Sequence, residues 1–385
     1  MKRIIFVINN MHVGGTRKSL LSLLNELSNM ENIHVDLLIM SHHGALMNEI
    51  PLGINVIKKD LVLQSLICKR SELDSIKEKI IRTIGAALQR IFGYDCCYPI
   101  IYKKCLKKLQ LKQYDASFGF QEGPSNDLAF YVPSKKHYAW IHNDFDNFKF
   151  SKSNSGIAKI YSHFDKIIFV ADASMQNFIS NHVGLESNCE VIKNTLNTSS
   201  ILKNASLQSE IEFMSNDLRL ITVGRANKQK GYDRLINVAK ELYYKGYSFE
   251  WIIVGGGNEL EQLRESVREN KLEKCVRFCG ENTNPYAIEK HADIYVMTSR
   301  YESQPLVLIE ALILGLPVIT TYFNSSKEVV GGLGCAIMCD NSEEGLLNAL
   351  ENIIKNKSKI IEMKKSAMDY NYTNEKYVKR ILELC

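Results

Sequence analysis

The sequence predicts an α/β protein built from two doubly wound parallel sheets. Three observations support this fold class. Short β-branched apolar runs alternate with segments of helical periodicity along most of the chain. The alternation lapses once, near residue 195, and then starts again. The length of 385 residues corresponds to two or three domains at roughly 150 residues each.

The first half of the chain carries the first alternating series. A strand at residues 3–8 is followed by a two-glycine turn, Gly14-Gly15, and by a helix with leucines on one face. A longer helix is expected where apolar residues recur at helical spacing, at Ile76, Ile80, Ile84, Leu88 and Ile91. Further strands are expected at 34–40, 114–120, 139–142 and 166–170.

The second half carries its own series after a polar segment rich in Ser and Asn, which begins at Asn194 and predicts a linker. Strands are expected at 218–223, 249–254, 275–279, 293–297 and 316–320. We therefore expect Rossmann-like domains at 1–195 and 196–370. A ligand should bind in the cleft between them, outside the carboxyl ends of the strands.

The net charge of +5 comes entirely from the first half. Residues 69–112 hold eleven basic side chains against four acidic ones, a local balance of +7. This segment is either a solvated helical face or a surface that meets anionic lipid headgroups or an anionic acceptor. Nucleic acid is not an expected partner, because no recognised binding motif accompanies the charge.

The chain is expected to be cytoplasmic. Its first residues, MKRIIFVINN, lack the long apolar stretch of a secretory signal, and no apolar run approaches the ~18 residues needed to span a bilayer. The ten cysteines are scattered rather than arranged as a disulfide framework, so we expect free thiols in a reducing compartment.

The first motif with chemical meaning follows the strand at 218–223. Arg225 and Lys230 lie five residues apart on a loop bounded by Gly224 and Gly231 that opens a helix. They can converge on one diphosphate, because helix N-termini favour anions and arginine binds phosphate oxygens bidentately. Basic loops are common on protein surfaces, so the interpretation depends on the second motif.

The second motif places Glu302 just before Pro305, which can open a helix, and Glu310 one to two turns inside that helix. Two carboxylates at a helix mouth can hold vicinal hydroxyls. The backbone N–H groups of Leu306 and Val307 would face phosphate. The structural alternative is an ordinary helix whose N-terminal acid is stabilised by the helix dipole.

Together these motifs resemble the retaining glycosyltransferases of the GT-B fold that carry a Glu-x7-Glu motif, the glycosyltransferase family 4 type. The resemblance covers nearly the whole chain. It rests on the Gly14-Gly15 loop, Trp140 to Asp144, Asn194, the Gly-Arg-x4-Lys-Gly loop, Val254 to Gly257, the glutamate pair, and Gly315 to Ile319. Residues 305–310 are similar to the Pro-x-Val-Leu-x-Glu variant of enzymes that build bacterial surface polysaccharides.

The resemblance implies roles for individual residues. Arg225 and Lys230 would neutralise the donor diphosphate, Glu310 would bind the ribose hydroxyls, and Glu302 would bind hydroxyls of the transferred sugar. His142, close to Trp140 in the sequence, would be catalytic or would orient the sugar.

The Gly14-Gly15 loop would let the backbone approach donor and acceptor closely, since glycine has no Cβ. Residues 371–385 would form a helix that returns to the first domain. No cofactor or metal is expected, because Arg225 and Lys230 already supply positive charge. The Asp144-Phe145-Asp146 sequence spells a metal-binding D-x-D, but it lies away from the predicted phosphate loop.

The activity implied is transfer of a hexosyl unit, with retention, from a nucleotide sugar to a hydroxyl of a glycan or lipid-linked acceptor, and the expected donor is UDP-linked. The setting would be bacterial surface polysaccharide or glycoconjugate synthesis, with segment 69–112 in peripheral contact with the inner membrane face.

Two alternatives stay open: a sugar-nucleotide epimerase, and a catalytically silent GT-B subunit that binds glycan or stabilises a partner transferase. A silent subunit is expected to have lost the phosphate-binding cations or the motif carboxylates. This sequence keeps all four of them, Arg225, Lys230, Glu302 and Glu310. A dinucleotide-dependent oxidoreductase would need a phosphate fingerprint after the first strand, which residues 8–15 do not provide.

Overall fold

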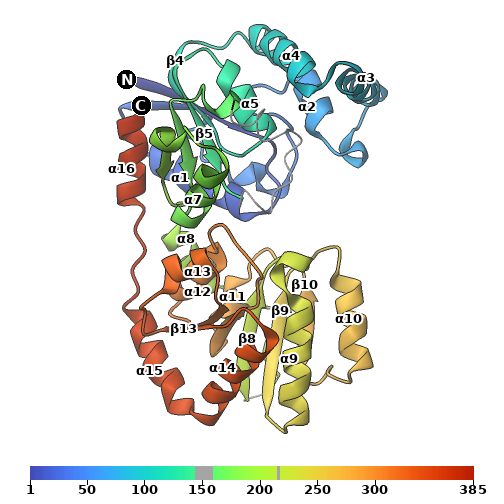
Figure 1. The fold of residues 1–385 in the computed structure, drawn as a ribbon, viewed down its shortest axis with the longest axis vertical. Helices are drawn as coiled ribbons and strands as arrows, with labels where there is room; N and C mark the ends of the chain where they lie inside the picture. Colours follow the sequence, from blue (N-terminus) through green and yellow to red (C-terminus); the bar gives the residue numbers. More distant parts are fainter. Residues whose placement is uncertain (144–158, 215–216) are drawn as a thin grey trace. The chain divides into compact units, whose positions relative to one another are not determined.

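The computed structural model describes residues 1–143, 159–214 and 217–385 and divides into two compact units (Figure 1). Unit 1 comprises Met1–Leu196 and Thr373–Cys385, and unit 2 comprises Asn197–Tyr372. Each unit is built on one parallel sheet covered by helices, which confirms the predicted α/β fold class.

The sheet of unit 1 has seven parallel strands in the order β3-β2-β1-β4-β5-β6-β7. Their bounds are β1 Lys2–Ile8, β2 Ile33–Ile39, β3 Asn55–Val56, β4 Tyr114–Gly119, β5 Ser134–Ile141, β6 Lys166–Phe169 and β7 Cys189–Val191. The two outer strands were not predicted, because β3 and β7 have only two and three residues and lack a period that a sequence pattern can reveal.

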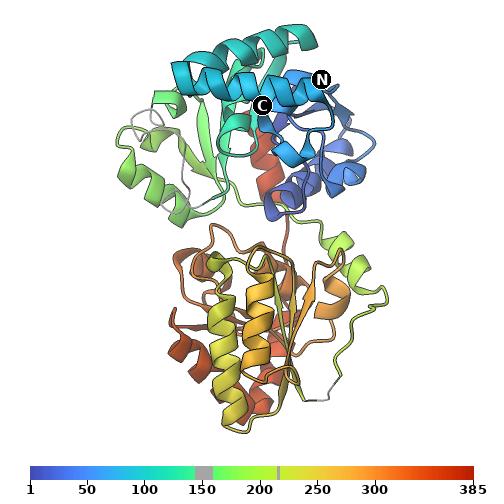
Figure 2. The ribbon, with the colours of Figure 1, turned by 90° about the vertical axis from the view of Figure 1, so that its right-hand side faces the viewer.

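The helices of unit 1 cover both faces of this sheet. Alternate residues of β1 point to opposite faces, so Phe6 packs with the leucines of α1 while Val7 packs with α4 and α5. The described helices are α1 Gly15–Ser28, α2 Leu61–Ile67, α3 Ile76–Phe92, α4 Tyr94–Leu109, α5 Pro124–Tyr131, α7 Asp172–Asn181 and α16 Glu375–Leu384. Figure 2 shows α3 and α4 side by side at the top of the unit.

The last helix of the chain, α16, belongs to unit 1. Val378, Ile381 and Leu384 are buried in the same core as α1. The chain is fastened just before α16 by Asn374, whose side chain donates to Glu26 Oε1 at 2.9 Å and accepts from the Leu196 N–H at 3.0 Å. Residues far apart in sequence therefore close this core.

The sheet of unit 2 has six parallel strands in the order β10-β9-β8-β11-β12-β13. Their bounds are β8 Leu218–Val223, β9 Phe249–Val254, β10 Val276–Gly280, β11 Ile294–Met297, β12 Val318–Thr321 and β13 Ala336–Cys339. The five strands expected here form within two residues of their predicted limits, because each contains a short apolar run, and β9, β11 and β12 are buried along their whole length.

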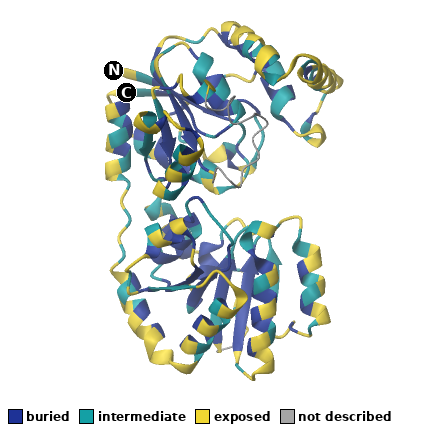
Figure 3. Ribbon diagram, viewed as in Figure 1, coloured by how far each residue is buried: buried dark blue, intermediate teal, exposed yellow. Residues whose placement is uncertain are grey.

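Helices again cover both faces of the second sheet. One core lies under α9, α10 and α14, and the other under α11 and α12. The helices are α8 Thr198–Ala205, α9 Tyr232–Tyr244, α10 Leu260–Glu269, α11 Tyr286–Glu289, α12 Leu306–Ile313, α13 Asn324–Val330, α14 Glu343–Lys355 and α15 Lys357–Met368. Figure 3 shows the buried strands inside each unit and the exposed outer sides of the helices. Within the described ranges, no helix is both long and apolar enough to cross a membrane.

Candidate functional site

The two sequence motifs of unit 2 meet at the point where its strand order reverses. β8 and β11 are neighbours in the sheet, although β9 and β10 lie between them in sequence. The basic loop leaves the carboxyl end of β8, and the loop with Glu302 leaves the carboxyl end of β11. Crevices at such switch points are the usual ligand sites of open α/β sheets.

Lys230 and Glu302 form an ion pair at this switch point. The Lys230 ammonium lies 2.6 Å from Glu302 Oε1, and the two side chains are 17% and 12% exposed. Glu302 also accepts hydrogen bonds from the Ser299 hydroxyl at 2.9 Å and from Gln229 Nε2 at 3.2 Å. A cation and a carboxylate are thereby held together, each with part of its surface still open to solvent.

Gly231 brings the two loops together. Its φ of 67° is left-handed, and a Cβ there would lie 2.3 Å from the Thr298 carbonyl oxygen. The Thr298 hydroxyl in turn donates to the Lys230 carbonyl at 2.7 Å. Because glycine allows this close approach, the end of the β8 loop is fastened to the start of the β11 loop, and Lys230 is placed beside Glu302.

The glycine run at 255–257 supports the basic loop from the other side. The Gly224 N–H donates to Val254 and the Ala226 N–H donates to Gly256, at 2.9 and 2.7 Å. Gly255 has φ 141°, and a Cβ there would lie 1.9 Å from the Gly224 carbonyl oxygen. The run therefore serves the packing of the 224–226 backbone, a structural role that its sequence alone did not indicate.

Arg225 lies exposed on the same loop. Within the described residues its side chain has no hydrogen bond or ion pair, so the guanidinium is available to an anion. The helix start across the switch point is less open than expected, because the Leu306 N–H donates to the Gln304 carbonyl at 2.9 Å. A phosphate at the Leu306 amide would have to displace this bond, whereas Val307 lies half-buried one residue further into α12.

Glu310 lies inside α12 and is buried. Its Oε1 accepts a hydrogen bond from the Tyr286 hydroxyl at 2.8 Å. Tyr286 begins α11, on the same face of the sheet as α12. The two glutamates of the motif therefore differ in setting: Glu302 is partly open and paired with a cation, and Glu310 is buried and paired with a phenol.

In unit 1, His142 follows the carboxyl end of β5 and is buried. Its ring stacks on Trp140 and contacts Phe120, with centroid distances of 6.0 and 4.9 Å. Burial, and then the positive charge of Arg17, lower the pKa of His142 to about 3. Its Nε2 is buried without a hydrogen-bond partner among the described residues. His142 is therefore a neutral imidazole, and one of its ring nitrogens has no partner among the residues that the structure describes.

A buried carboxylate, Glu122, holds the backbone around His142. Glu122 follows β4 and accepts the His142 N–H at 2.9 Å, and it also accepts from the Asn143 side chain. Burial raises the pKa of Glu122. β4 lies between β1 and β5, so Glu122 stands at the same edge of the sheet as His142 and the Gly14-Gly15 loop.

The two glycines lie at the start of α1, which begins at Gly15 with Gly14 as its N-cap. Space around Gly14 is open, since a Cβ there would meet no heavy atom within 4 Å. No acidic side chain lies in the first turn of α1. The helix start is thus accessible and bears no acidic side chain of its own.

Sequence reasoning missed three residues that support the predicted ones: Glu122, Ser299 and Tyr286. Glu122 left one signal, an acid three residues after the end of a strand. Ser299 and Tyr286 left none, because their partners become neighbours only when the strands assemble. The D-x-D sequence at 144–146 lies outside the described residues, and in the ranges that are described no group of three metal-ligating side chains converges.

Comparison with known proteins shows what unit 2 and the whole fold resemble. Residues 205–374, less than half of the chain, match the family model described as "Glycosyl transferases group 1". A solved structure, Anabaena HepE in complex with UDP and glucose, aligns over 100% of this chain and 99% of its own with a TM-score of 0.70 and 15% identity. This likeness shows that the chain has the same GT-B fold.

Among curated relatives, an uncharacterized glycosyltransferase of Methanocaldococcus jannaschii is 29% identical over 194 residues, 48% of each chain. The 4-alpha-N-acetylgalactosaminyltransferase of Campylobacter jejuni, whose name includes a sugar-linked diphospho-undecaprenol, is 25% identical over 53% of this chain and 57% of its own. The matched part therefore spans about half the length of these relatives.

Proposed function

We propose that the protein is a retaining glycosyltransferase. It moves a hexosyl unit from a UDP-linked sugar to a hydroxyl of a glycan or lipid-linked acceptor. The observation that carries this proposal is the contact between Lys230 and Glu302 at the switch point of unit 2. A cation suited to a diphosphate there lies directly beside a carboxylate suited to sugar hydroxyls.

The reaction separates charge, and the residues of the site suit that separation. As the glycosidic bond breaks, negative charge develops on the diphosphate, where Arg225, Lys230 and the positive end of the α12 dipole would stabilise it. Glu302 would accept hydroxyls of the transferred sugar and Glu310 those of the ribose. We propose that these groups act without a metal ion or other cofactor.

The relatives support the substrate classes. HepE binds UDP and glucose on the same fold, which favours a UDP-linked donor. The Campylobacter relative carries diphospho-undecaprenol in its name, and an amylovoran biosynthesis glycosyltransferase of Erwinia amylovora also matches part of the chain. They favour a role in bacterial surface polysaccharide or glycoconjugate synthesis, at the cytoplasmic face of the membrane.

The experiment that tests the proposal is a thermal-shift panel of UDP, GDP, ADP and their sugars with EDTA present. A ligand that binds only the folded state raises its melting temperature. We expect a UDP-selective rise that is lost in Arg225→Ala and kept in Lys228→Ala, a matched change of an exposed cation in the same loop.

The other outcomes separate the alternatives. No shift with any nucleotide, in protein shown to be folded, would favour the catalytically silent subunit. Conversion of the donor sugar in the absence of an acceptor would identify an epimerase. With an acceptor in hand, the anomeric proton coupling of the product, measured by NMR, reports retention or inversion directly.

A further inference from the structure

Helix α3 presents an apolar face to solvent. Isoleucines recur along it at helical spacing and lie 77%, 53%, 54% and 70% exposed, at Ile76, Ile80, Ile84 and Ile91. Ala87 continues the same face between Ile84 and Ile91 and is also exposed. At 1.5 Å per residue this face extends for roughly 25 Å along the 17-residue helix. Contiguous exposed apolar surface of this kind marks an interaction site.

The opposite face of α3, which contacts α2, is centred on Glu78, Arg82 and Gly85. Glu78 is buried there and accepts a hydrogen bond from Gln64 Nε2 at 2.9 Å. Arg82 donates to the Leu66 carbonyl at 3.2 Å. Gly85 faces the side chain of Leu66, which would lie 2.3 Å from a Cβ at this position. The helix is therefore inverted relative to an ordinary surface helix, which turns its apolar stripe inward.

These contacts also fix how the helix is rotated about its axis. Glu78 accepts the N–H groups of Asp74 and Ser75, each at 3.0 Å, and so caps α3 from within. Rotating the isoleucines inward would expose this carboxylate network and bring Ile side chains against α2. The exposed apolar face is thus specified by the packing of unit 1.

Basic side chains border the apolar face. Lys77 lies on one side of it and Lys79 and Arg90 on the other, all exposed. The neighbouring α4 adds further exposed cations and one exposed apolar side chain, at Lys103, Lys104, Lys107, Lys108 and Ile100. An apolar stripe between basic flanks is typical of helices that lie in the plane of a membrane surface.

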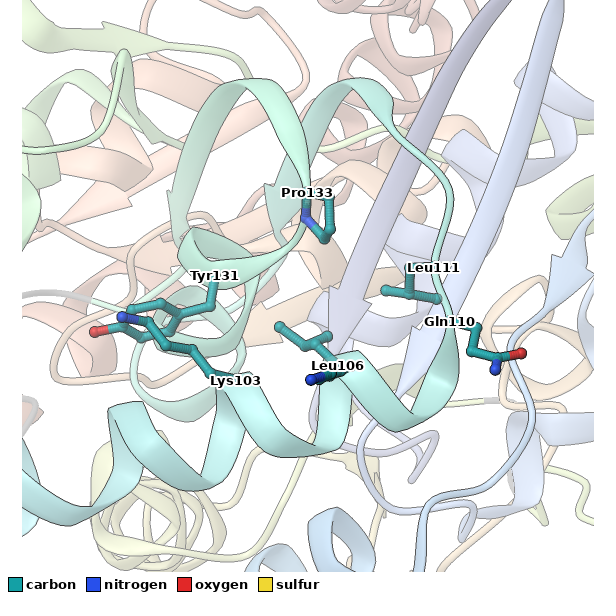
Figure 4. A pocket seen from close by; sticks show the side chains of 7 residues that line it. Lys103, Leu106, Gln110, Leu111, Tyr131 and Pro133 are labelled. Carbon is teal, nitrogen blue, oxygen red and sulfur yellow. The ribbon is translucent and has the colours of Figure 1, made fainter.

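A hollow beside α4 also combines basic and apolar groups. It has a volume of about 270 Å³ and combines lysine ammonium groups with apolar surface (Figure 4). Lys103 extends alongside the Tyr131 ring, with Nζ 5.2 Å from the ring centroid. Pro133 and Leu111 line it just before β5 and β4, so it lies at the amino edge of the sheet, opposite to His142.

We propose that α3 is an in-plane membrane anchor that binds anionic phospholipid bilayers. Its isoleucines insert among the acyl chains near the headgroups, and Lys77, Lys79 and Arg90 contact lipid phosphates. A second copy of the chain is a poorer occupant, because pairing two α3 faces would bring the same cations together. The proposal deepens the proposed function, since a lipid-linked acceptor is reached at a membrane.

The test is flotation of the full chain with phospholipid vesicles. We expect binding to vesicles with ~30% phosphatidylglycerol, weaker binding to pure phosphatidylcholine, and loss of binding as salt rises. Replacing Ile80 and Ile84 together by Ser should lower the affinity about tenfold or more. Both side chains are already exposed, so the unfolding midpoint should not fall. Ile361→Ser, a change of a 72% exposed isoleucine on α15 in unit 2, is the matched control.

Three outcomes would overturn the anchor: no binding of the wild type to anionic vesicles, equal binding of the double variant, or a concentration-dependent dimer that the double variant abolishes without any vesicle binding. The UDP thermal shift, measured on the same samples, reports the proposed function separately. Vesicle binding without a UDP shift leaves the anchor standing and removes the transferase, and the reverse result does the opposite.

Discussion

Replacing Glu302 by Gln should tighten the binding of UDP. In the structure Glu302 Oε1 forms an ion pair with the Lys230 ammonium at 2.6 Å. A diphosphate that uses Lys230 must compete with this carboxylate and also meets its negative charge. Gln keeps the shape of the side chain and an acceptor for Ser299, but it lacks the charge. The variant therefore releases the lysine to the ligand.

The size of the effect follows from the setting of the pair. A hydrogen bond between charged groups contributes about 1.5–3 kcal/mol. Because 17% of the Lys230 side chain and 12% of the Glu302 side chain stay exposed, we take the lower end, about 1.5 kcal/mol. This corresponds to about a tenfold lower Kd for UDP. Turnover should fall in the same variant, because Glu302 is proposed to hold the transferred sugar.

Isothermal titration of UDP without sugar is the assay, since it separates diphosphate binding from sugar binding. Glu269→Gln is the control, because it removes one exposed carboxylate at the end of α10, at the opposite edge of the sheet. In a Lys230→Met background, Glu302→Gln should gain little, since the pair no longer exists. An unchanged or weaker UDP affinity in folded Glu302→Gln protein would refute the competition between carboxylate and diphosphate.

Four further predictions concern pH dependence, stability and nucleotide binding. Because the pKa of His142 is about 3, its ring stays neutral between pH 5 and 8. The pH profile of kcat/KM should therefore keep its shape in His142→Gln. A step near pH 6.5 that only the wild type shows would contradict this. Since an unfolded histidine titrates at 6.5, this site also loses stability as pH falls from 6.5 toward 3, and His142→Gln should reduce that loss in denaturant titrations. Ile381→Ala should lower the free energy of unfolding by about 2–4 kcal/mol, because Ile381 is fully buried in the core of unit 1, whereas Ile361→Ala should cost little. Equal unfolding midpoints for the two variants would disprove that α16 stabilises this core. Gly255→Ala should lower the melting temperature and abolish the UDP shift, because its Cβ would overlap the Gly224 carbonyl, and wild-type behaviour would show that this backbone contact is dispensable.

Much of the fold could be predicted because its signals are local. The runs that form β1, β8 and β9 are apolar and β-branched, and their limits agree with the structure within one residue. The helix with isoleucines at 76–91 is present as α3, and it ends at Phe92 with Gly93 as its C-cap, whose φ is 78°. The edge strands β3 and β7 escaped prediction, because two or three residues show no period and pair only through their neighbours.

The candidate site was likewise predictable only in part. The sequence identified Arg225, Lys230 and Glu302 by residue type and by loop position. It could not show that Lys230 and Glu302 touch, because they are 72 residues apart and become neighbours only when β11 pairs with β8. Ser299 and Glu122 are contacts of the same kind, created by strand order and by turns at the sheet edge.

By itself the sequence determined the class of fold, the positions of most strands, and the spacing of the apolar and charged side chains along each helix. Only the tertiary structure decided which way those helices face. The isoleucines of α3 have the period of an ordinary core helix, and their pattern is the same whether the stripe meets protein or lipid. The buried carboxylate of Glu78 and the close approach of Gly85 to Leu66 take up the side of α3 that contacts α2, and the isoleucine stripe therefore lies outward.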